Sequence, residues 1–192
     1  MSTGGVHVCG VRFMAETAKI LSKDKKILTP RMDAGCPMAD MVEYEDLLEY
    51  KKNNPERYIV SYVNTTAKVK TLTDICVTSS TAMSIMNQIE ANQILFLPDK
   101  NLGGYIKKQV PDKDIELWPG FCLTHHRLQK ETVLMMKKRH PKALVLAHPE
   151  CNEEVLTTAD YIGSTKGIID YVNNSKDVQF IIATEDGIMH PL

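Results

Sequence analysis

The strongest constraint on the fold is an internal repeat with an offset of 86 residues. When residues 36–106 are laid on residues 122–192 without a gap, 11 of 71 positions are identical, whereas average residue usage gives about four by chance. The identities include Cys36 and Cys122, Lys51-Lys52 and Lys137-Lys138, Pro55 and Pro141, Val69 and Val155, and Asp74 and Asp160. Two unrelated segments of the same class can share such spacing, but the repeat favours related units that place equivalent residues around a common axis.

Short apolar runs alternate with amphipathic segments along the chain. Runs of β-branched and other apolar residues predict buried strands at 27–28, 58–63, 75–77, 94–97, 144–147 and 178–182. Segments with helical periodicity lie at 41–52, 81–92, 128–139 and 165–174. This alternation predicts an α/β fold with short parallel sheets between helices. In such sheets ligands bind beyond the carboxyl ends of the strands, so the polar residues that follow each strand matter most.

The repeat pairs polar residues at these strand ends. Tyr62 is equivalent to His148, Asn64 to Glu150 and Ser79 to Thr165. Cys36 and Cys122 are predicted to face one point, each at the start of a helix whose N-terminus would lower the pKa of the thiol. Pro37 suits a first helical position. A third equivalent of the cysteine would fall at position 208, beyond Leu192.

Composition excludes several classes of protein. The net charge is −1, which leaves no basic excess for nucleic-acid phosphates. No apolar run approaches the ~20 residues of a membrane span, and the first residues lack the features of a signal peptide. The five cysteines are widely spaced and form no Cys-x-x-Cys pair. They are therefore predicted to be reduced thiols of a cytoplasmic protein that binds neither nucleic acid nor membrane.

Eight motifs, in order along nearly the whole chain, resemble those of the quinolinate synthases. They are the segments 9–21, 34–41, 62–65, 74–80, 98–103, 118–122, 148–151 and 163–165, among them Ala34-Gly35-Cys36-Pro37-Met38-Ala39-Asp40-Met41, Tyr62-Val63-Asn64-Thr65 and His148-Pro149-Glu150-Cys151. Any one of these motifs alone would be weak. Their order and coverage make the resemblance specific.

The resemblance implies a fold and a reaction. Quinolinate synthases condense iminoaspartate with dihydroxyacetone phosphate to quinolinate, with loss of phosphate and water, in de novo NAD biosynthesis. Three αβα units in a pseudo-threefold arrangement surround a [4Fe-4S] cluster, to which each unit gives one cysteine, and the open iron acts as a Lewis acid. The family also implies a functional link with L-aspartate oxidase. Helix N-termini and hydroxyl groups can bind the anionic substrates without a basic patch.

The roles carry over to matching positions. Cys36 and Cys122 resemble two of the cluster ligands. The substrate-binding positions are Tyr62, Val63, Asn64, Ser79, His148, Pro149, Glu150 and Thr165, and Tyr62, His148 and Glu150 are the candidates for proton transfer. Cys9, Cys76 and Cys151 are predicted to be structural. The sequence leaves open whether one of His125 and His126 belongs to the site.

The family pattern and the repeat together predict incomplete units. Residues 1–35 are assigned to the tail of a first unit, 36–121 to a second repeat register and 122–192 to a third register that is truncated. The third cysteine and a substrate-binding His and Ser of the first unit are not found in the sequence, so the 192-residue chain alone is expected not to be competent. Two alternatives remain, a non-catalytic α/β remnant and a protein that binds small anions or phosphosugars and has structural cysteines.

Overall fold

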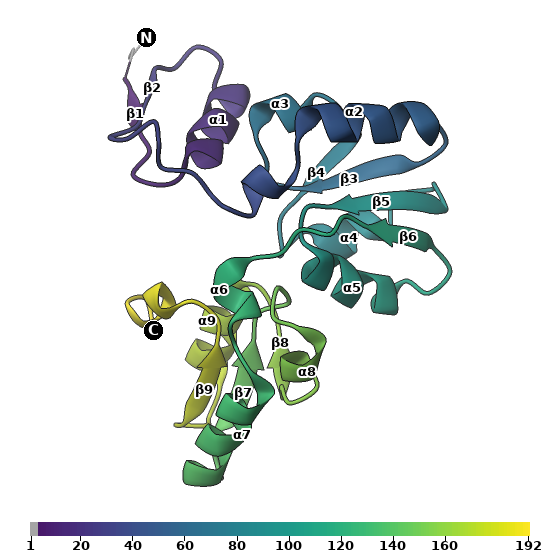
Figure 1. Ribbon diagram of the computed structural model, residues 1–192. Coiled ribbons are helices and arrows are strands. Elements are labelled where there is room, and N and C mark those ends of the chain that lie inside the picture. The colour runs from purple at the N-terminus through teal and green to yellow at the C-terminus, as the bar shows by residue number, and fades with distance from the viewer. Residues whose placement is uncertain (1–3) are drawn as a thin grey trace.

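The computed structural model describes residues 4–192 as three parallel sheets joined by helices (Figure 1). The N-terminal part holds β1 (Val6–His7), α1 (Arg12–Leu21) and β2 (Ile27–Leu28). The middle part holds η1 (Ala39–Met41), α2 (Tyr44–Asn53), β3 (Tyr58–Tyr62), α3 (Ala67–Lys70), β4 (Ile75–Val77), α4 (Ala82–Met86), β5 (Gln93–Leu97), α5 (Lys100–Gln109) and β6 (Asp114–Leu117). The C-terminal part holds α6 (Leu123–His126), α7 (Lys130–Arg139), β7 (Leu144–Ala147), α8 (Glu153–Leu156), β8 (Tyr161–Ile162), α9 (Thr165–Asn174), β9 (Phe180–Ala183) and η2 (Asp186–Met189). The α/β architecture predicted from the alternating pattern is confirmed.

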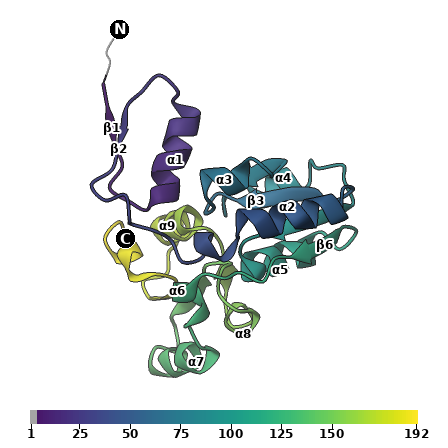
Figure 2. The same cartoon turned by 45° about the horizontal axis from the view of Figure 1, so that its top comes forward.

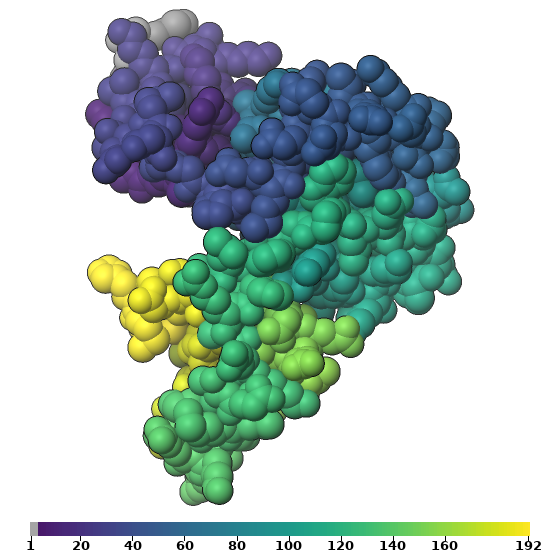
Figure 3. All heavy atoms as spheres, viewed as in Figure 1, coloured from purple at the N-terminus to yellow at the C-terminus, as the bar shows by residue number. Residues whose placement is uncertain are grey.

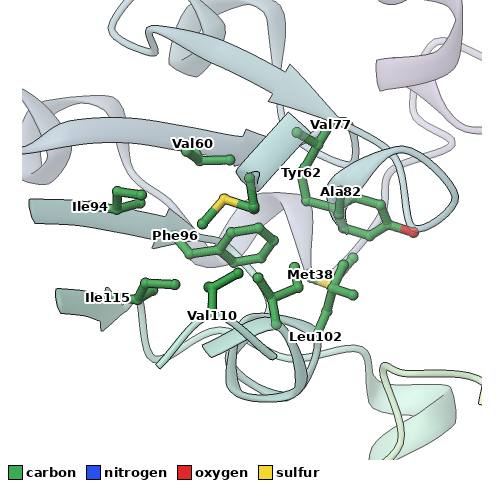
Figure 4. Packing of buried hydrophobic residues seen from close by; sticks show 12 residues of the cluster. Met38, Val60, Tyr62, Val77, Ala82, Ile94, Phe96, Leu102, Val110 and Ile115 are labelled. Carbon is green, nitrogen blue, oxygen red and sulfur yellow. The ribbon is translucent and has the colours of Figure 1, made fainter. Parts of the chain in front are cut away.

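The middle sheet has the strand order β4-β3-β5-β6 and is covered by helices on both faces. Successive residues of β5 point to opposite sides. Ile94 and Phe96 pack with residues of α4 and α5, whereas Leu95 and Leu97 pack with residues of α2 and α3. Figure 4 shows the first of these cores, with the Phe96 ring inside it. This two-sided burial explains why β5 is a continuous apolar run.

The C-terminal sheet, of order β8-β7-β9, repeats this arrangement. Val145 and Ala147 of β7 pack with residues of α7 and α8, and Leu146 packs with Ile168 of α9. Helices α7 and α8 thus take the places of α2 and α3, and α9 takes the side of α4. Figure 1 shows the two sheets as separate layers, with α6 between them.

The structure reproduces the 86-residue offset in strand register and in side-chain contacts. Val60 pairs with Ile75, and Leu146 with Tyr161 at the equivalent positions. The backbone N–H of Ile59 donates to Oδ2 of Asp74 at 2.7 Å, and the equivalent N–H of Val145 donates to Oδ2 of Asp160 at 2.8 Å. The identities therefore correspond to shared local geometry. The exact boundaries 1–35, 36–121 and 122–192 stay a prediction.

The N-terminal strands β1 and β2 match β5 and β6 in register. His7 pairs with Leu28, and Gln93 pairs with Asp114 at the positions 86 residues later. In Figure 2 this β1-α1-β2 unit, with its two parallel strands, stands apart from the middle sheet. Figure 3 shows the three parts of the chain on the molecular surface. An open notch separates the N-terminal part from the C-terminal end. The arrangement is that of related units around a common region.

Several local predictions are wrong. The helix predicted over 81–92 covers only Ala82–Met86, and Val178, placed in a buried strand, lies before β9 with 91% of its surface exposed. Pro37 lies in a turn before η1 and not at a first helical position. Helix α5 was not predicted because Gly103 and Gly104 have poor intrinsic helix propensity. Packing of the helix against the sheet overrides that propensity.

No helix among residues 4–192 is long and apolar enough to cross a membrane. This finding agrees with the absence of a long apolar run in the sequence.

The two adjacent glycines of α5 give a matched test of this packing. A Cβ on Gly103 would lie 2.7 Å from Phe96 and from Leu117, whereas a Cβ on Gly104 would meet its nearest atom at 3.9 Å. Both changes to alanine gain helix propensity of up to about 1 kcal/mol. Because the ring of Phe96 is fully buried, we expect Gly103→Ala to lose about 1–3 kcal/mol by overpacking.

Thermal unfolding of the two variants provides the measurement. We expect Gly104→Ala to melt at or above the temperature of the unchanged protein and Gly103→Ala to melt below it. Equal melting temperatures for the two variants would contradict the close approach of α5 to the sheet.

Candidate functional site

The carboxyl ends of β3 and β7 meet through one buried hydrogen bond. Tyr62 is the last residue of β3, and Glu150 follows β7 by three residues. The Tyr62 hydroxyl donates to Oε1 of Glu150 at 2.7 Å. Figure 4 shows the Tyr62 ring in the core of the middle sheet with its hydroxyl at the edge of the cluster. The two strand ends, 88 residues apart in sequence, therefore form one site.

His125 of α6 extends this contact to a thiol. Its Nδ1 lies 3.1 Å from Oε2 of Glu150 and 3.2 Å from Sγ of Cys122, and its Nε2 lies 2.8 Å from Oγ1 of Thr184. The side chains of His125 and Glu150 are only 8% and 4% exposed. Burial opposes charge on either side chain. The hydrogen bonds to Cys122 and then to Glu150 nevertheless raise the pKa of His125, and the hydrogen bond to His125 lowers the pKa of Glu150. They form a buried ion pair.

His148 lies against this pair in the neutral form. Its ring stacks on that of His125 with 4.7 Å between the ring centroids. Burial lowers the pKa of His148 to about 4, although the charge of Glu150 acts in the opposite direction. The backbone N–H of Glu150 donates to Nδ1 of His148 at 3.3 Å, which fixes that nitrogen as an acceptor. Nε2 of the neutral ring therefore carries the hydrogen, so His148 can donate a hydrogen bond to a ligand through that nitrogen.

Burial also raises the pKa of Tyr62. The negative charge of Glu150 and the hydrogen bond to it act in the same direction, and a contact with the Ser79 hydroxyl acts against them. Tyr62 is thus a neutral hydroxyl between Glu150 and Ser79, able to pass on a proton without carrying charge.

Asp99 and Asn101, which follow β5, tie the middle sheet to the site. Oδ2 of Asp99 accepts the backbone N–H of Cys122 at 2.9 Å, and its Oδ1 accepts those of Asn101 and Leu102 at the start of α5. Burial and then the charge of Glu150 raise the pKa of Asp99 to about 7 despite these bonds. The Asn101 side chain donates to the carbonyl oxygen of Glu150 at 3.0 Å. These contacts fix the loop that carries Cys122.

The two candidate cluster ligands lie against the same core. Cys36 and Cys122 are both partly buried beside the core that contains Tyr62 and Phe96. Burial raises the pKa of Cys36 and outweighs the backbone hydrogen bonds of Ala39 and Met38, which lower it; the charges of Cys122 and Glu150 add smaller upward contributions. The expected net lowering is therefore wrong for Cys36, because burial exceeds the effect of the backbone N–H groups at the start of the short 3-10 turn η1.

The donor set fits a metal centre. Cys122, His125 and Glu150 bring a sulfur, a nitrogen and an oxygen within 4.8 Å of one another. Cys36 adds a second thiol from the other repeat. Two thiols against one core fit part of the ligand set of an iron–sulfur cluster, which is held by thiolates.

The other predicted residues fall into two groups. Pro149 is buried between His148 and Glu150, and Ser79 is half-buried beside Tyr62. Val63 and Asn64 are half-buried after β3, and Thr165 is exposed as the first residue of α9, where Ser164 caps the helix. The structure thus brings Tyr62, Ser79, His148 and Glu150 together but gives Thr165 no comparable place.

The remaining cysteines are arranged differently. Cys151 is buried, and its thiol donates to the carbonyl oxygen of Ala183 at 3.3 Å; burial raises its pKa to about 12. Cys9 and Cys76 are exposed, so only Cys151 of the three cysteines predicted to be structural is buried.

Sequence reasoning missed Asp99, Asn101 and Thr184, and left His125 open. Each of the three missed residues follows a strand of the parallel sheets, β5 or β9. The rule that ligand sites lie at the carboxyl ends of strands could therefore have found them. The position of His125 depends on where α6 packs, for which the sequence holds no comparable signal.

A cavity adjoining this region lies outside the site. A cavity of about 430 Å³ between α5 and α8 is lined by residues including Lys100, Asn101, Tyr105 and Glu153. Asn101 reaches from its wall to Glu150, so the cavity and the site share one residue.

The fold and the site define an α/β repeat protein with a buried acid–base network and a thiol-containing metal donor set where the repeats meet. A sequence model described as quinolinate synthetase A protein matches residues 3–192. The chain is 55% identical over 184 residues to the quinolinate synthase of Caldicellulosiruptor bescii, covering 96% of this chain and 61% of the relative. It is 51% identical over 187 residues to the quinolinate synthase of Clostridioides difficile, covering 97% of this chain and 62% of the relative.

The chain belongs to the quinolinate synthetase A family. It spans about 61% of the length of the curated relatives that it matches. The family predicted from the sequence motifs is confirmed.

The buried pair makes a testable contribution to stability. Glu150→Ala would leave the His125 imidazole and the Tyr62 hydroxyl without their buried acceptor, which we expect to lower the free energy of unfolding by about 3 kcal/mol. Glu154→Ala, at an exposed position of α8, is the control and should change it by less than about 0.5 kcal/mol. Denaturant unfolding measures both, and equal effects would contradict the buried network.

Proposed function

We propose that the protein containing this chain is a quinolinate synthase, which condenses iminoaspartate with dihydroxyacetone phosphate to quinolinate and releases phosphate and water. The observation that carries the proposal is the buried contact from Tyr62 through Glu150 and His125 to Cys122. It joins proton-transfer groups from two repeats to a candidate metal ligand, in a chain of this family.

Cys36 and Cys122 would hold the metal cofactor, a [4Fe-4S] cluster, together with a thiolate from outside these 192 residues. The cluster supplies, when bound, a Lewis-acidic iron with an exchangeable position. The support is chemical. Both thiols lie against one core, and the repeat relates them to each other.

The side chains around the thiols have distinct tasks. Glu150 is held as a carboxylate by His125 and accepts the Tyr62 hydroxyl, so a proton can pass from Tyr62 to Oε1 of Glu150 when a ligand donates to Tyr62. Neutral His148 provides a hydrogen-bond donor through Nε2. The burial of these groups excludes water from the imine, which water would hydrolyse.

Binding of the anionic substrates falls to polar groups after β3 and β4. Asn64 follows Tyr62 by two residues in the sequence, and the Ser79 hydroxyl contacts the Tyr62 hydroxyl. Both side chains can donate to a carboxylate or phosphate. Val63 and Pro149 line the same strand ends, and Thr165 is the matching hydroxyl of the other repeat. The proposal includes a cytoplasmic location and a functional link with L-aspartate oxidase, because iminoaspartate must come from oxidation of aspartate.

The product of the complete reading frame that contains this sequence tests the proposal. After anaerobic reconstitution with iron and sulfide, we expect it to form quinolinate from iminoaspartate and dihydroxyacetone phosphate. A protein with a full cluster that forms no quinolinate would overturn the proposed reaction. A protein that takes up no iron and sulfide would favour the alternative of an anion-binding protein with structural cysteines.

Cysteine substitutions test the cluster ligands. We expect Cys36→Ser and Cys122→Ser each to abolish most iron and sulfide incorporation, because a cluster that loses one thiolate is labile. Cys76→Ser is the matched control, since Cys76 is an exposed thiol on β4, and it should keep its iron content. Iron and sulfide analysis with the visible absorbance of the cluster decides, and full incorporation in Cys36→Ser would exclude its role.

The two tyrosines of β3 test the proton-transfer role. Tyr62→Phe removes the hydroxyl bonded to Glu150, and we expect kcat to fall about 10²-fold with the cluster retained. Tyr58→Phe, at the start of the same strand, should leave kcat within about twofold. Steady-state kinetics on reconstituted protein provide the measurement. A normal kcat in Tyr62→Phe would reject the role.

A further inference from the structure

A mixed donor set lies inside the site and differs from the set that an iron–sulfur cluster uses. The sulfur of Cys122, a nitrogen of His125 and a carboxylate oxygen of Glu150 lie within 4.8 Å of one another. Cys36 does not belong to this group. We propose that, in protein without the cluster, these three residues bind a single divalent transition metal of the zinc type, in competition with cluster assembly.

The spacing of the donors fits one tetrahedral ion. Zinc bonds of ~2.0–2.3 Å to nitrogen, oxygen and sulfur place neighbouring ligand atoms about 3.2–3.6 Å apart. Nδ1 of His125 lies 3.2 Å from Sγ of Cys122 and 3.1 Å from Oε2 of Glu150. Small adjustments of these side chains would suffice, with the fourth position left to water.

The groups behind the donors are already arranged for a metal. A metal-binding histidine commonly donates through its other nitrogen to a fixed acceptor, and a metal-binding carboxylate is hydrogen-bonded at its other oxygen. Nε2 of His125 lies 2.8 Å from the Thr184 hydroxyl, and Oε1 of Glu150 accepts the Tyr62 hydroxyl at 2.7 Å. Both unused atoms are thus held, and Nδ1 and Oε2 face the thiol.

The donor chemistry selects the class of ion. A thiolate, an imidazole and a carboxylate together suit Zn²⁺ or Co²⁺, whereas Mg²⁺ and Ca²⁺ prefer oxygen alone. Because His125 and Glu150 are almost completely buried, we expect a bound ion to dissociate slowly.

The inference does not rest on the proposed function, because the three donors lie together whatever reaction the site performs. Its consequence for the cluster follows from Cys122, which both metal species would require. As metal ligands, Cys36 is needed only for the cluster, and His125 and Glu150 are needed only for the single ion, so variants can separate the two metal species.

Cobalt is the probe, added anaerobically to cluster-free full-length protein. We expect one Co²⁺ per chain, with a thiolate-to-cobalt charge-transfer band and visible bands of tetrahedral intensity, all displaced by Zn²⁺. Cys122→Ser should lose the charge-transfer band, and His125→Ala and Glu150→Gln should weaken Co²⁺ binding at least about tenfold. Thr184→Val keeps all three donors and should weaken binding about tenfold through His125 alone.

Cys36→Ser is the matched control and should bind Co²⁺ as the unchanged protein does. Zn²⁺ added before reconstitution should block iron and sulfide uptake in the unchanged protein but not in His125→Ala. Absence of the cobalt bands, full affinity in folded His125→Ala and Glu150→Gln, or loss of the bands in Cys36→Ser would each overturn the inference.

Discussion

The hydrogen bond between the Tyr62 hydroxyl and Glu150 joins two parts of the chain that have their own sheets and their own cores. Each sheet is covered on both faces by its own helices, so its packing does not fix where the other sheet lies. The polar contacts at the strand ends provide that link. They include the Asn101 amide on the Glu150 carbonyl and the Asp99 carboxylate on the Cys122 N–H. The site is therefore also part of the junction.

Burial of this polar network is costly unless every group has a partner. His125 satisfies this condition with Glu150 on one nitrogen and Thr184 on the other, and Glu150 has partners on both oxygens. No buried side-chain polar atom among residues 4–192 lacks a hydrogen-bond partner. A fully satisfied network is rigid, which suits the proposed role of these groups in holding protons at fixed positions next to Cys122.

The repeat explains why the site draws on equivalent positions with different chemistry. Tyr62 and His148 hold the same place at the ends of β3 and β7, as do Asn64 and Glu150. The shared scaffold includes the Asp74 and Asp160 contacts that brace each strand start. Substitution at the strand ends then diversifies the site without disturbing the cores. Cys36 and Cys122 also hold equivalent positions in the two repeats, and both lie against one core.

The sequence by itself determined the α/β class, the strands from Tyr58 and Leu144, the repeat register and the residues Tyr62, His148 and Glu150 as strand-end groups, because these follow from local periodicity and spacing. It also determined the family. Only the tertiary structure decided that His125 lies between Cys122 and Glu150, that Asp99 fixes the Cys122 loop, and that α5 forms across two glycines. Those features depend on packing between elements far apart in sequence. Such packing can override local propensity and bring together side chains whose separate positions carry no signal.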